Sequence, residues 1–323
     1  MLTTARIGFR VHRFEILMAV LACVIVTITA AIVTVHLIQA NALVPAGCWD
    51  ELFWSSVPPS SSCESPGLFF AARDDSAPVM TAMFVLPLLV GLLLGVPLVA
   101  GELETRTAET AWILAGSRNR WLAYLAIPTL ALILVAVGGA AVMAQILAAA
   151  REPWLVDGPG WESIGSFGTI VVARGAVAFG AGLLAGAVVG RTLPALIVAV
   201  IACAFIVIVA MGARQAWVTA NQQPLDGRNG NIPGAILGSG SRQTFIDSSG
   251  AVLTSEQAYA RIPPGLMDEA VGAWLSDNMR EVYLGVPASE VPAWERVEVI
   301  GLGATTALLL IGSFVVVNRR RPR

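Results

Sequence analysis

Long apolar runs alternate with polar segments along the chain, and the runs have the length of membrane-spanning helices. A helix needs about 20 apolar residues to cross the hydrocarbon core of a bilayer, which is roughly 30 Å thick. Six runs meet this requirement, at residues 16–36, 79–100, 122–149, 164–190, 193–212 and 297–317. Because backbone groups in lipid must be hydrogen-bonded within their own segment, each run is predicted to be a helix. The sequence therefore predicts an all-α membrane protein with six transmembrane helices.

The arginines between the runs predict how the chain is oriented in the membrane. They cluster before the first run, after the second run and behind the last run. These clusters comprise Arg6, Arg10, Arg13, Arg106, Arg118, Arg120, Arg319, Arg320, Arg321 and Arg323. Cytoplasmic segments close to membrane spans are enriched in basic residues, so both termini are predicted to be cytoplasmic. The arginines of the last polar loop carry little weight, because long loops cross the membrane largely regardless of charge.

This orientation divides the chain into four regions. Residues 1–15 are a cytoplasmic segment, and residues 16–212 hold the first five spans with an extracytoplasmic loop at 39–78. Residues 213–296 are a large extracytoplasmic loop, long enough to fold as a cap. Residues 297–323 hold the sixth span and an arginine-rich cytoplasmic tail.

Within the cap, apolar side chains recur at helical spacing and predict an amphipathic surface helix. One face holds Leu266, Ala270, Trp274 and Asn278, and the residues alongside are Val271, Leu275, Met279 and Val282. Such a helix either packs on the outer mouth of the bundle or takes part in substrate binding, and the pattern leaves both open.

The composition supports a membrane location and excludes nucleotide hydrolysis by this chain. Hydrophobic residues make up 56% of the chain and charged residues only 13%, whereas soluble domains are about one quarter charged. The net charge of −2 adds little. All 20 basic residues are arginine. A phosphate-binding loop of the Walker type needs a lysine, so any ATP hydrolysis must come from another polypeptide.

The four cysteines fall into two pairs with different expected roles. Cys23 and Cys203 lie within apolar runs and are predicted to be inert packing residues. Cys48 and Cys63 lie in the first extracytoplasmic loop, where an oxidising compartment would allow a disulfide. No His/Cys cluster has metal-ligand spacing, so we expect no metal site.

The polar segment at residues 101–121 differs from ordinary loop sequence. It lacks proline, its only internal glycine is Gly116, and residues 102–115 are suited to one helix of about four turns. Leu103, Thr107, Ala111 and Leu114 would share one side of this helix, and Glu102, Arg106 and Glu109 another. Ser117 is placed to cap the next helix, and Trp121 to anchor it at the membrane interface. Such a segment either lies on the membrane or docks into a cleft of a soluble partner.

Several parts of the chain resemble type-2 ABC transporter permeases, particularly an actinobacterial branch. The most specific part is Glu102-Leu103-Glu104, Thr107, Ala111-Trp112 and Ser117-Arg118-Asn119-Arg120-Trp121-Leu122. Further parts are Arg174-Gly175 and Gly190-Arg191-Thr192-Leu193-Pro194-Ala195. One departure is Arg106, where the family usually has a glycine before the threonine.

The resemblance implies the six-span membrane subunit of an ATP-driven exporter in the bacterial inner membrane. Such a permease pairs with a second copy or a sister permease and binds two cytoplasmic ATPase subunits, which hold ATP and Mg. No cofactor is implied for this chain, and no nucleic acid partner. Residues 1–15 correspond to an amphipathic elbow, and 101–121 to the coupling helix that receives motion from the ATPase. The coupling residues are Glu102, Leu103, Glu104, Arg106, Thr107, Trp112, Leu114, Arg118 and Arg120. The apolar cavity expected between two halves suits an amphipathic or lipophilic cargo such as a drug, natural product or lipid.

Arg174 is the one strongly polar residue well inside an apolar run. A charge near the bilayer centre is costly, on the order of 3 kcal/mol on insertion scales. Either the span begins near Ala173 and Arg174 extends outward to the interface, or Arg174 faces a wet cavity. In the second arrangement it contacts substrate or a carboxylate such as Glu298. Glu298 itself is expected at the outer surface, near the start of the last span.

Glycines at four-residue spacing predict close helix packing within the membrane. They are Gly91 and Gly95 in the second span and Gly182, Gly186 and Gly190 in the fourth.

Three other classes of protein compete with the exporter subunit. An intramembrane enzyme would need paired acids, a Ser/His pair or a metal cluster at membrane depth. A secondary transporter would be expected to carry acidic residues within its spans, and the core of no run has one. A non-transporting scaffold or sensor, with the cap as its ligand domain, is the third class. Association with an ABC ATPase would separate the exporter subunit from all three.

Overall fold

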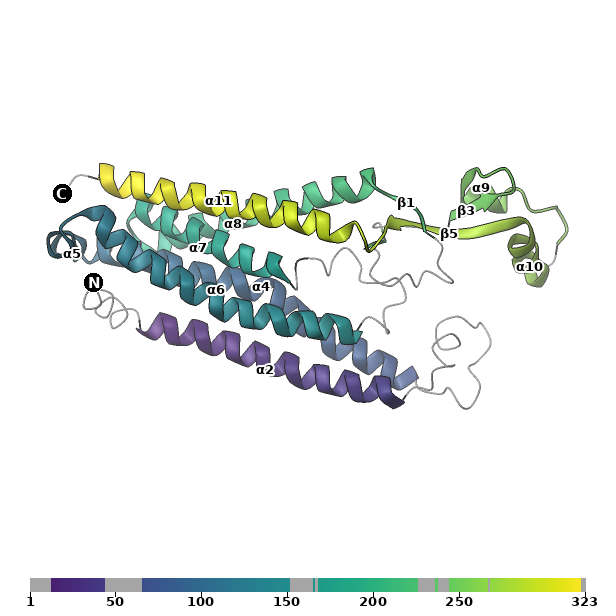
Figure 1. Ribbon diagram of the computed structural model, residues 1–323, viewed down its shortest axis with the longest axis horizontal. Helices are drawn as coiled ribbons and strands as arrows, with labels where there is room; N and C mark the ends of the chain where they lie inside the picture. Colours follow the sequence, from purple (N-terminus) through teal and green to yellow (C-terminus); the bar gives the residue numbers. More distant parts are fainter. Residues whose placement is uncertain are drawn as a thin grey trace.

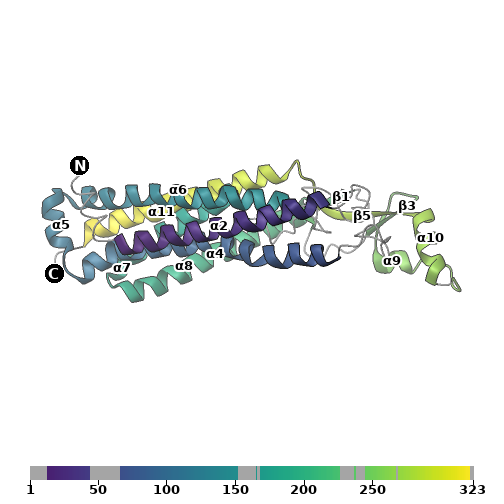
Figure 2. The same ribbon diagram turned by 90° about the horizontal axis from the view of Figure 1, so that it is seen from below.

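The computed structural model describes residues 13–43, 66–151, 165, 168–225, 236–237, 244–266 and 268–320. Most of the predicted elbow lies outside the described residues, as do the two cysteines of the candidate disulfide, Cys48 and Cys63. Within the described part, long helices lie side by side in a bundle, and a group of strands and short helices extends from one end (Figures 1 and 2).

Six of the described helices have the length and apolar composition of membrane spans. They are α2 (Arg13–Leu43), α4 (Pro66–Glu104), α6 (Arg118–Arg151), α7 (Thr169–Val189), α8 (Thr192–Ala220) and α11 (Val291–Arg319). The predicted six-span, all-α class is thereby confirmed. The predicted limits of the last two spans are too short, because α8 continues beyond residue 212 and α11 begins before residue 297.

The two ends of the bundle differ. α2 begins and α11 ends at the same end, and α5 (Ala108–Ala115) lies across that end (Figures 1 and 2). The strands and the short helices α9 (Ser255–Tyr259) and α10 (Asp268–Asn278) lie at the other end. We call these the α5 end and the cap end.

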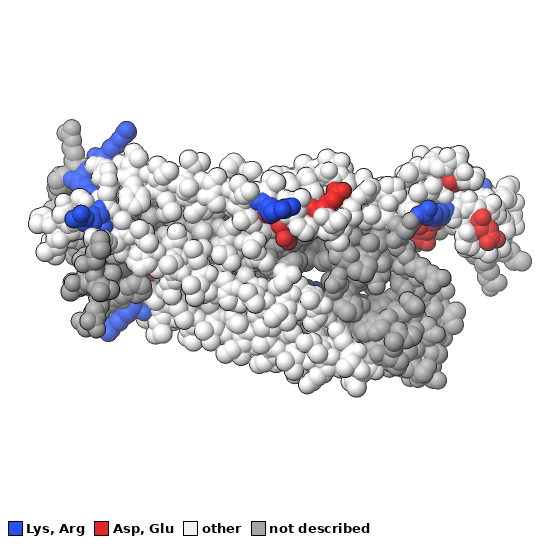
Figure 3. Space-filling view, in the orientation of Figure 1, with Lys and Arg blue, Asp and Glu red and all other residues white. Residues whose placement is uncertain are grey.

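Charged residues follow the same division. In Figure 3 basic residues gather at the α5 end, acidic and basic residues lie together toward the cap end, and the described surface between is largely uncharged. An uncharged belt between two polar ends is the surface expected of a membrane-spanning bundle.

α7 lies at the centre of the bundle, and small residues let α4 approach it closely. Most α7 side chains are buried. A Cβ on Gly91 would lie 2.5 Å from the carbonyl oxygen of Gly175, and one on Gly186 would lie 2.9 Å from that of Val96. The glycines with a predicted packing role that lie at this contact are Gly91, Gly95, Gly182 and Gly186. The two glycine pairs of the sequence therefore face each other across one helix contact.

Gly190, to which the sequence also assigns a packing role, instead ends α7. Its φ is 70°, in the left-handed region that glycine adopts at no steric cost. Its N–H donates to the carbonyl oxygen of Gly186 at 2.9 Å. A Cβ at this position would collide with the guanidinium group of Arg320. Gly190 therefore permits the tight turn into α8.

The region between α8 and α11 contains a small antiparallel sheet that the sequence pattern does not predict. Its strands are β1 (Gln223–Leu225), β2 (Ile236–Leu237), β3 (Thr244–Asp247), β4 (Val252–Thr254) and β5 (Met279–Val286). β5 pairs with β1, β2 and β3, and β3 pairs with β4. Its buried apolar cluster consists of Phe245, Leu253, Ala258, Leu275 and Met279.

The predicted surface helix of the cap exists as α10, but it is shorter than the apolar spacing suggests. α10 ends at Asn278, and Met279 and Val282 belong to β5. Val282 pairs with Thr244 of β3, and it is followed by Tyr283. β-branched and aromatic residues favour strands, and cross-strand packing overrides the helical periodicity here.

Candidate functional site

The connection between α4 and α6 (residues 101–121) protrudes at the α5 end. The predicted single helix over residues 102–115 is wrong, because α4 continues to Glu104 and α5 begins only at Ala108. Arg106 lies in the break with a φ of 58°. This left-handed conformation favours glycine, so Arg106, which has a side chain, adopts it at a steric cost.

α5 presents two large apolar side chains to the surface. Ile113 is 82% exposed and Leu114 is 78% exposed, whereas Ala108 and Ala115 on the opposite side are buried. The apolar side predicted for this segment is therefore divided, since Leu103 and Ala111 pack against the bundle core and Leu114 points away from it. Exposed large apolar groups among the charged residues of a bundle end mark an interaction surface.

The base of α5 is fixed by aromatic and cationic contacts. The Trp112 and Trp121 rings meet edge to face at 6.1 Å, and the Arg118 guanidinium lies 4.6 Å from the centre of the Trp112 ring. Trp121 is only 3% exposed, so its predicted role as an interfacial anchor is wrong. Ser117 caps α6 as predicted, because its hydroxyl oxygen accepts from the Arg120 N–H at 3.2 Å.

Hydrogen bonds tie this connection to the ends of other spans. Glu104 accepts from the backbone N–H of Thr192 at 2.9 Å and from its hydroxyl at 2.8 Å, so it satisfies the free N-terminus of α8. Arg118 donates to the carbonyl oxygen of Asn318 at 3.0 Å and to that of Arg320. Arg320 in turn donates to the Val188 carbonyl oxygen at 2.8 Å, at the end of α7. These contacts join the two ends of the connection to α8 and α11, and α11 in turn to the end of α7.

The other predicted coupling residues lie around the same break. The Thr107 hydroxyl donates to the Glu102 carboxylate. Arg106, Thr107 and Arg120 are exposed.

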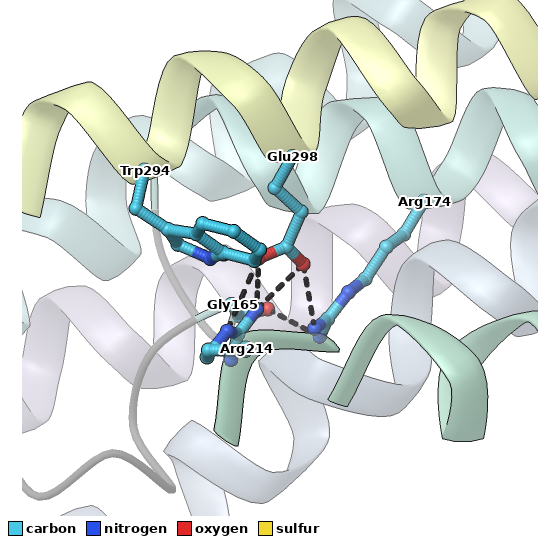
Figure 4. A network of polar contacts seen from close by, with 5 residues as sticks. All are labelled: Gly165, Arg174, Arg214, Trp294 and Glu298. Atoms are coloured by element: carbon cyan, nitrogen blue, oxygen red, sulfur yellow. Dashed lines mark hydrogen bonds and ion pairs between the residues drawn. The ribbon is translucent and has the colours of Figure 1, made fainter. Parts of the chain in front are cut away.

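A second polar site is buried toward the cap end, where α7, α8 and α11 meet (Figure 4). Arg174, Arg214 and Glu298 are 1%, 1% and 6% exposed. Arg214 donates to Glu298 through Nη2 at 2.5 and 2.6 Å and through Nε at 3.1 Å. Trp294 Nε1 also donates to this carboxylate, at 3.0 Å. We call Arg174, Arg214 and Glu298 the buried charge cluster.

Arg174 does not extend to the interface. α7 begins at Thr169, and the Arg174 side chain turns inward to contact Glu298, with 3.6 Å between Nη2 and Oε1. Its Nη1 donates to the carbonyl oxygen of Gly165 at 2.8 Å, and its guanidinium lies 4.7 Å from the centre of the Phe84 ring. Of the partners that the sequence suggests for an inward-facing Arg174, the structure shows the carboxylate of Glu298.

Glu298 and Arg214 lie in positions that differ from those predicted from the sequence. Glu298 is buried about two turns inside α11 instead of lying at its start, because α11 begins at Val291. The predicted boundary at residue 212 places Arg214 in the cap, but α8 continues to Ala220 and contains Arg214. The apolar Trp217 and Val218 beyond Arg214 are the signal that the helix continues.

The cap holds an open groove of about 780 Å³ between α10 and the sheet. Its lining residues include Phe245, Asp247, Tyr259, Leu275 and Glu281. Asp247 closes the β3–β4 turn, accepting from Ser249 N at 2.9 Å and Ala251 N at 3.0 Å and pairing with Arg261 at 2.5 Å. Bonds from the Ser249 hydroxyl, Arg261 and the backbone N–H groups of Ala251 and Ser249 hold the pKa of Asp247 well below its ordinary value.

This pKa predicts how the stability of the cap depends on pH. Because the folded-state pKa of Asp247 is below the unfolded value, its stabilising contribution is complete above pH 4 or so and is lost as pH falls further. Asp247→Asn is expected to lower the melting temperature at pH 7, and the difference from wild type should shrink below about pH 4. Thermal unfolding across pH, with Asp277→Asn as an exposed control, checks this. A difference that stays constant down to pH 2 or so would contradict it.

Among the described residues, no group of three or more His, Cys, Asp or Glu side chains is arranged to hold a metal ion.

The bundle and its protruding connection define a multi-pass membrane protein, in bacteria a protein of the cell membrane. Residues 16–214 match the family described as "ABC-2 membrane transporter related". The chain belongs to this family and is a permease subunit of an ABC transporter, a class that associates with ABC ATPases. No curated protein and no solved structure matches the chain.

Proposed function

We propose that this permease subunit works in an ATP-driven exporter and that α5 is the surface through which it receives motion from a cytoplasmic ATPase. The observation that carries the proposal is the pair of exposed side chains Ile113 and Leu114, at the end of the bundle where the chain also ends. Arginine enrichment at this end supports a cytoplasmic location for it. The described residues leave the pair exposed, and such an apolar pair is suited to a cleft on a soluble partner.

The contacts at the base of α5 support a mechanical role. Glu104 and Arg118 join the connection to α8 and α11, and Arg320 joins α11 to α7. When two ATPase subunits close on ATP and Mg, a push on α5 is passed to these three spans. Two permeases, either two copies or a copy and a sister subunit, then open their shared cavity outward.

The cargo that fits this arrangement is amphipathic or lipophilic, such as a drug, a natural product or a lipid. The spans are strongly apolar, with 18-residue windows whose mean hydropathy is 1.8 to 3.1. A cavity formed between two such bundles is lined mainly by apolar side chains, with few polar groups to give orientation.

Removal of the apolar pair tests the proposal. The double variant Ile113→Ser and Leu114→Ser should reduce the affinity for the cognate ABC ATPase by about tenfold or more, because central apolar anchors dominate interfaces. The measurement is co-purification and ATP hydrolysis of the co-expressed complex. Ile127→Ser with Val135→Ser is the matched control, because both residues are more than half exposed on the lipid-facing surface of α6.

The control complex should assemble and hydrolyse ATP like wild type. A double variant of Ile113 and Leu114 that still binds the ATPase with wild-type affinity would overturn the role of α5.

A further inference from the structure

Arg174 is a buried cation whose hydrogen bonding is incomplete. Its Nη1 donates to Gly165, but its Nη2 finds no acceptor among the described residues, although the side chain is only 2% exposed. A guanidinium group has five N–H donors. Buried donors in folded proteins are nearly always paired, and a buried charge without partners is costly.

Glu298 neutralises part of the charge of Arg174 but accepts no hydrogen bond from its Nη2. Oε2 of Glu298 accepts from Nε and Nη2 of Arg214 and from Trp294, and Oε1 accepts from Nη2 of Arg214 at 2.5 Å. Nη2 of Arg174 lies 3.6 Å from Oε1, a distance at which the charges attract but no hydrogen bond forms.

The surroundings of Arg174 keep its guanidinium in one place. The Phe84 ring covers one side of the guanidinium, whose central carbon lies 4.7 Å from the ring centre. On another side Gly165, with a φ of 92°, has no side chain, and the guanidinium occupies the space that a side chain would fill. A Cβ at Gly165 would overlap both terminal nitrogens of Arg174. An arginine side chain within a membrane span usually extends toward the interface, where water solvates its charge. The Arg174 side chain instead points into the bundle.

We propose that Arg174 is a binding residue for the anionic group of an amphiphile, a phosphate or carboxylate that accepts from Nη2. Arginine binds such groups through charge-assisted hydrogen bonds in a fixed geometry. The site lies about one and a half turns inside the cap end of α7, at the depth of an amphiphile whose tail lies in the bilayer. The anion is either the head of a transported amphiphile or the headgroup of a membrane lipid; the first source rests on the proposed function.

The test measures binding to the purified full-length chain in nanodiscs of a zwitterionic lipid. The probes are dodecyl phosphate, dodecanoate and uncharged dodecanol, which share one tail. Wild type should bind the two anions about tenfold or more tighter than dodecanol, as expected for a charge-assisted hydrogen bond. Equal binding of all three probes by wild type would overturn the proposal without reference to any variant.

Variants then locate the preference. Arg174→Gln should reduce it to about twofold or less, and Arg174→Lys should keep part of it, because lysine retains the charge but not the fork of donors. Arg296→Gln, an exposed arginine at the cap end of α11, is the matched control and should bind like wild type. A preference that survives in folded Arg174→Gln, as judged by its thermal unfolding, would overturn the proposal.

One further experiment distinguishes a lipid headgroup from a transported amphiphile as the source of the anion. The design also keeps the anion-site proposal separate from the proposed exporter function. In nanodiscs that include phosphatidylglycerol, a site that binds lipid headgroups would show weaker probe binding, because the anionic lipid competes with the probe. A site specific for a transported amphiphile would bind the probe with unchanged affinity. Both results support an anion site. Because no ATPase is present in these assays, failure of the ATPase to bind the chain would remove the exporter function and leave the anion preference as a separate result.

Discussion

Glu298→Gln is expected to lower the free energy of unfolding by about 3–5 kcal/mol, the usual effect of removing one partner from a buried ion pair. The carboxylate is the one negative group of the buried charge cluster, in which Arg214 binds it at 2.5 Å and Arg174 lies 3.6 Å away. Without it, two buried guanidinium groups face each other in a medium of low dielectric constant. The measurement is reversible unfolding of the purified chain in mixed micelles.

Glu290→Gln is the matched control, because this exposed carboxylate precedes α11 and makes no capping hydrogen bond with its side chain. Its effect should remain within about 0.5 kcal/mol. Adding Arg174→Gln to Glu298→Gln should restore part of the lost stability, since the second change removes one uncompensated charge. Wild-type stability in the single variant Glu298→Gln would show that the cluster does not hold α7, α8 and α11 together.

Gly91→Ala is expected to destabilise the bundle by about 1–3 kcal/mol, the range found when an extra methyl group is forced into a packed core. The new Cβ would lie 2.5 Å from the Gly175 carbonyl oxygen and 2.7 Å from the Phe179 backbone nitrogen. Both atoms belong to the backbone of α7, so only a shift of a whole helix relieves the overlap. Unfolding in mixed micelles and the yield of folded protein measure the effect.

Gly138→Ala is the control for the same chemical change. Gly138 lies in α6 with no atom within 4 Å of an added Cβ, so alanine there should be neutral or stabilising by up to about 1 kcal/mol. Equal effects of the two substitutions would mean that the contact between α4 and α7 is looser than the structure shows.

Hydropathy predicts the spans because lipid imposes one requirement on every residue of a run. Each apolar run in the sequence corresponds to a helix, and the glycine spacing of α4 and α7 indicates where these helices come close. Hydropathy predicts the ends of the spans less accurately, because a charged residue lowers the local hydropathy even where a buried ion pair allows it to lie within a span. Arg214 and Glu298 neutralise each other inside the bundle. Arg214 falls beyond the limit that hydropathy sets for its span, and Glu298 lies among the first residues of the predicted sixth run although α11 begins at Val291.

Local pattern also fails where a tertiary contact competes with it. Residues 102–115 have helical spacing, but Arg106 adopts a left-handed conformation and divides the segment. Met279 and Val282 continue the spacing of α10, but they pair with β3 as part of β5. Trp121 has the composition of an interfacial anchor, but Trp112 of α5 covers it. In each case the helical spacing or composition is outweighed by a contact or conformation that only the folded chain provides.

Photo-cross-linking from α5 tests the proposed ATPase contact most directly. A photoreactive amino acid at Leu114 should form an adduct with the ATPase subunit in membranes of cells that express both proteins, and the adduct yield should change when ATP is added. The same group at Ile127 on the lipid-facing side of α6 should form none. If the subunits co-purify and no adduct forms at Leu114, or if Ile127 gives the same adduct, α5 is not the surface that receives motion from the ATPase.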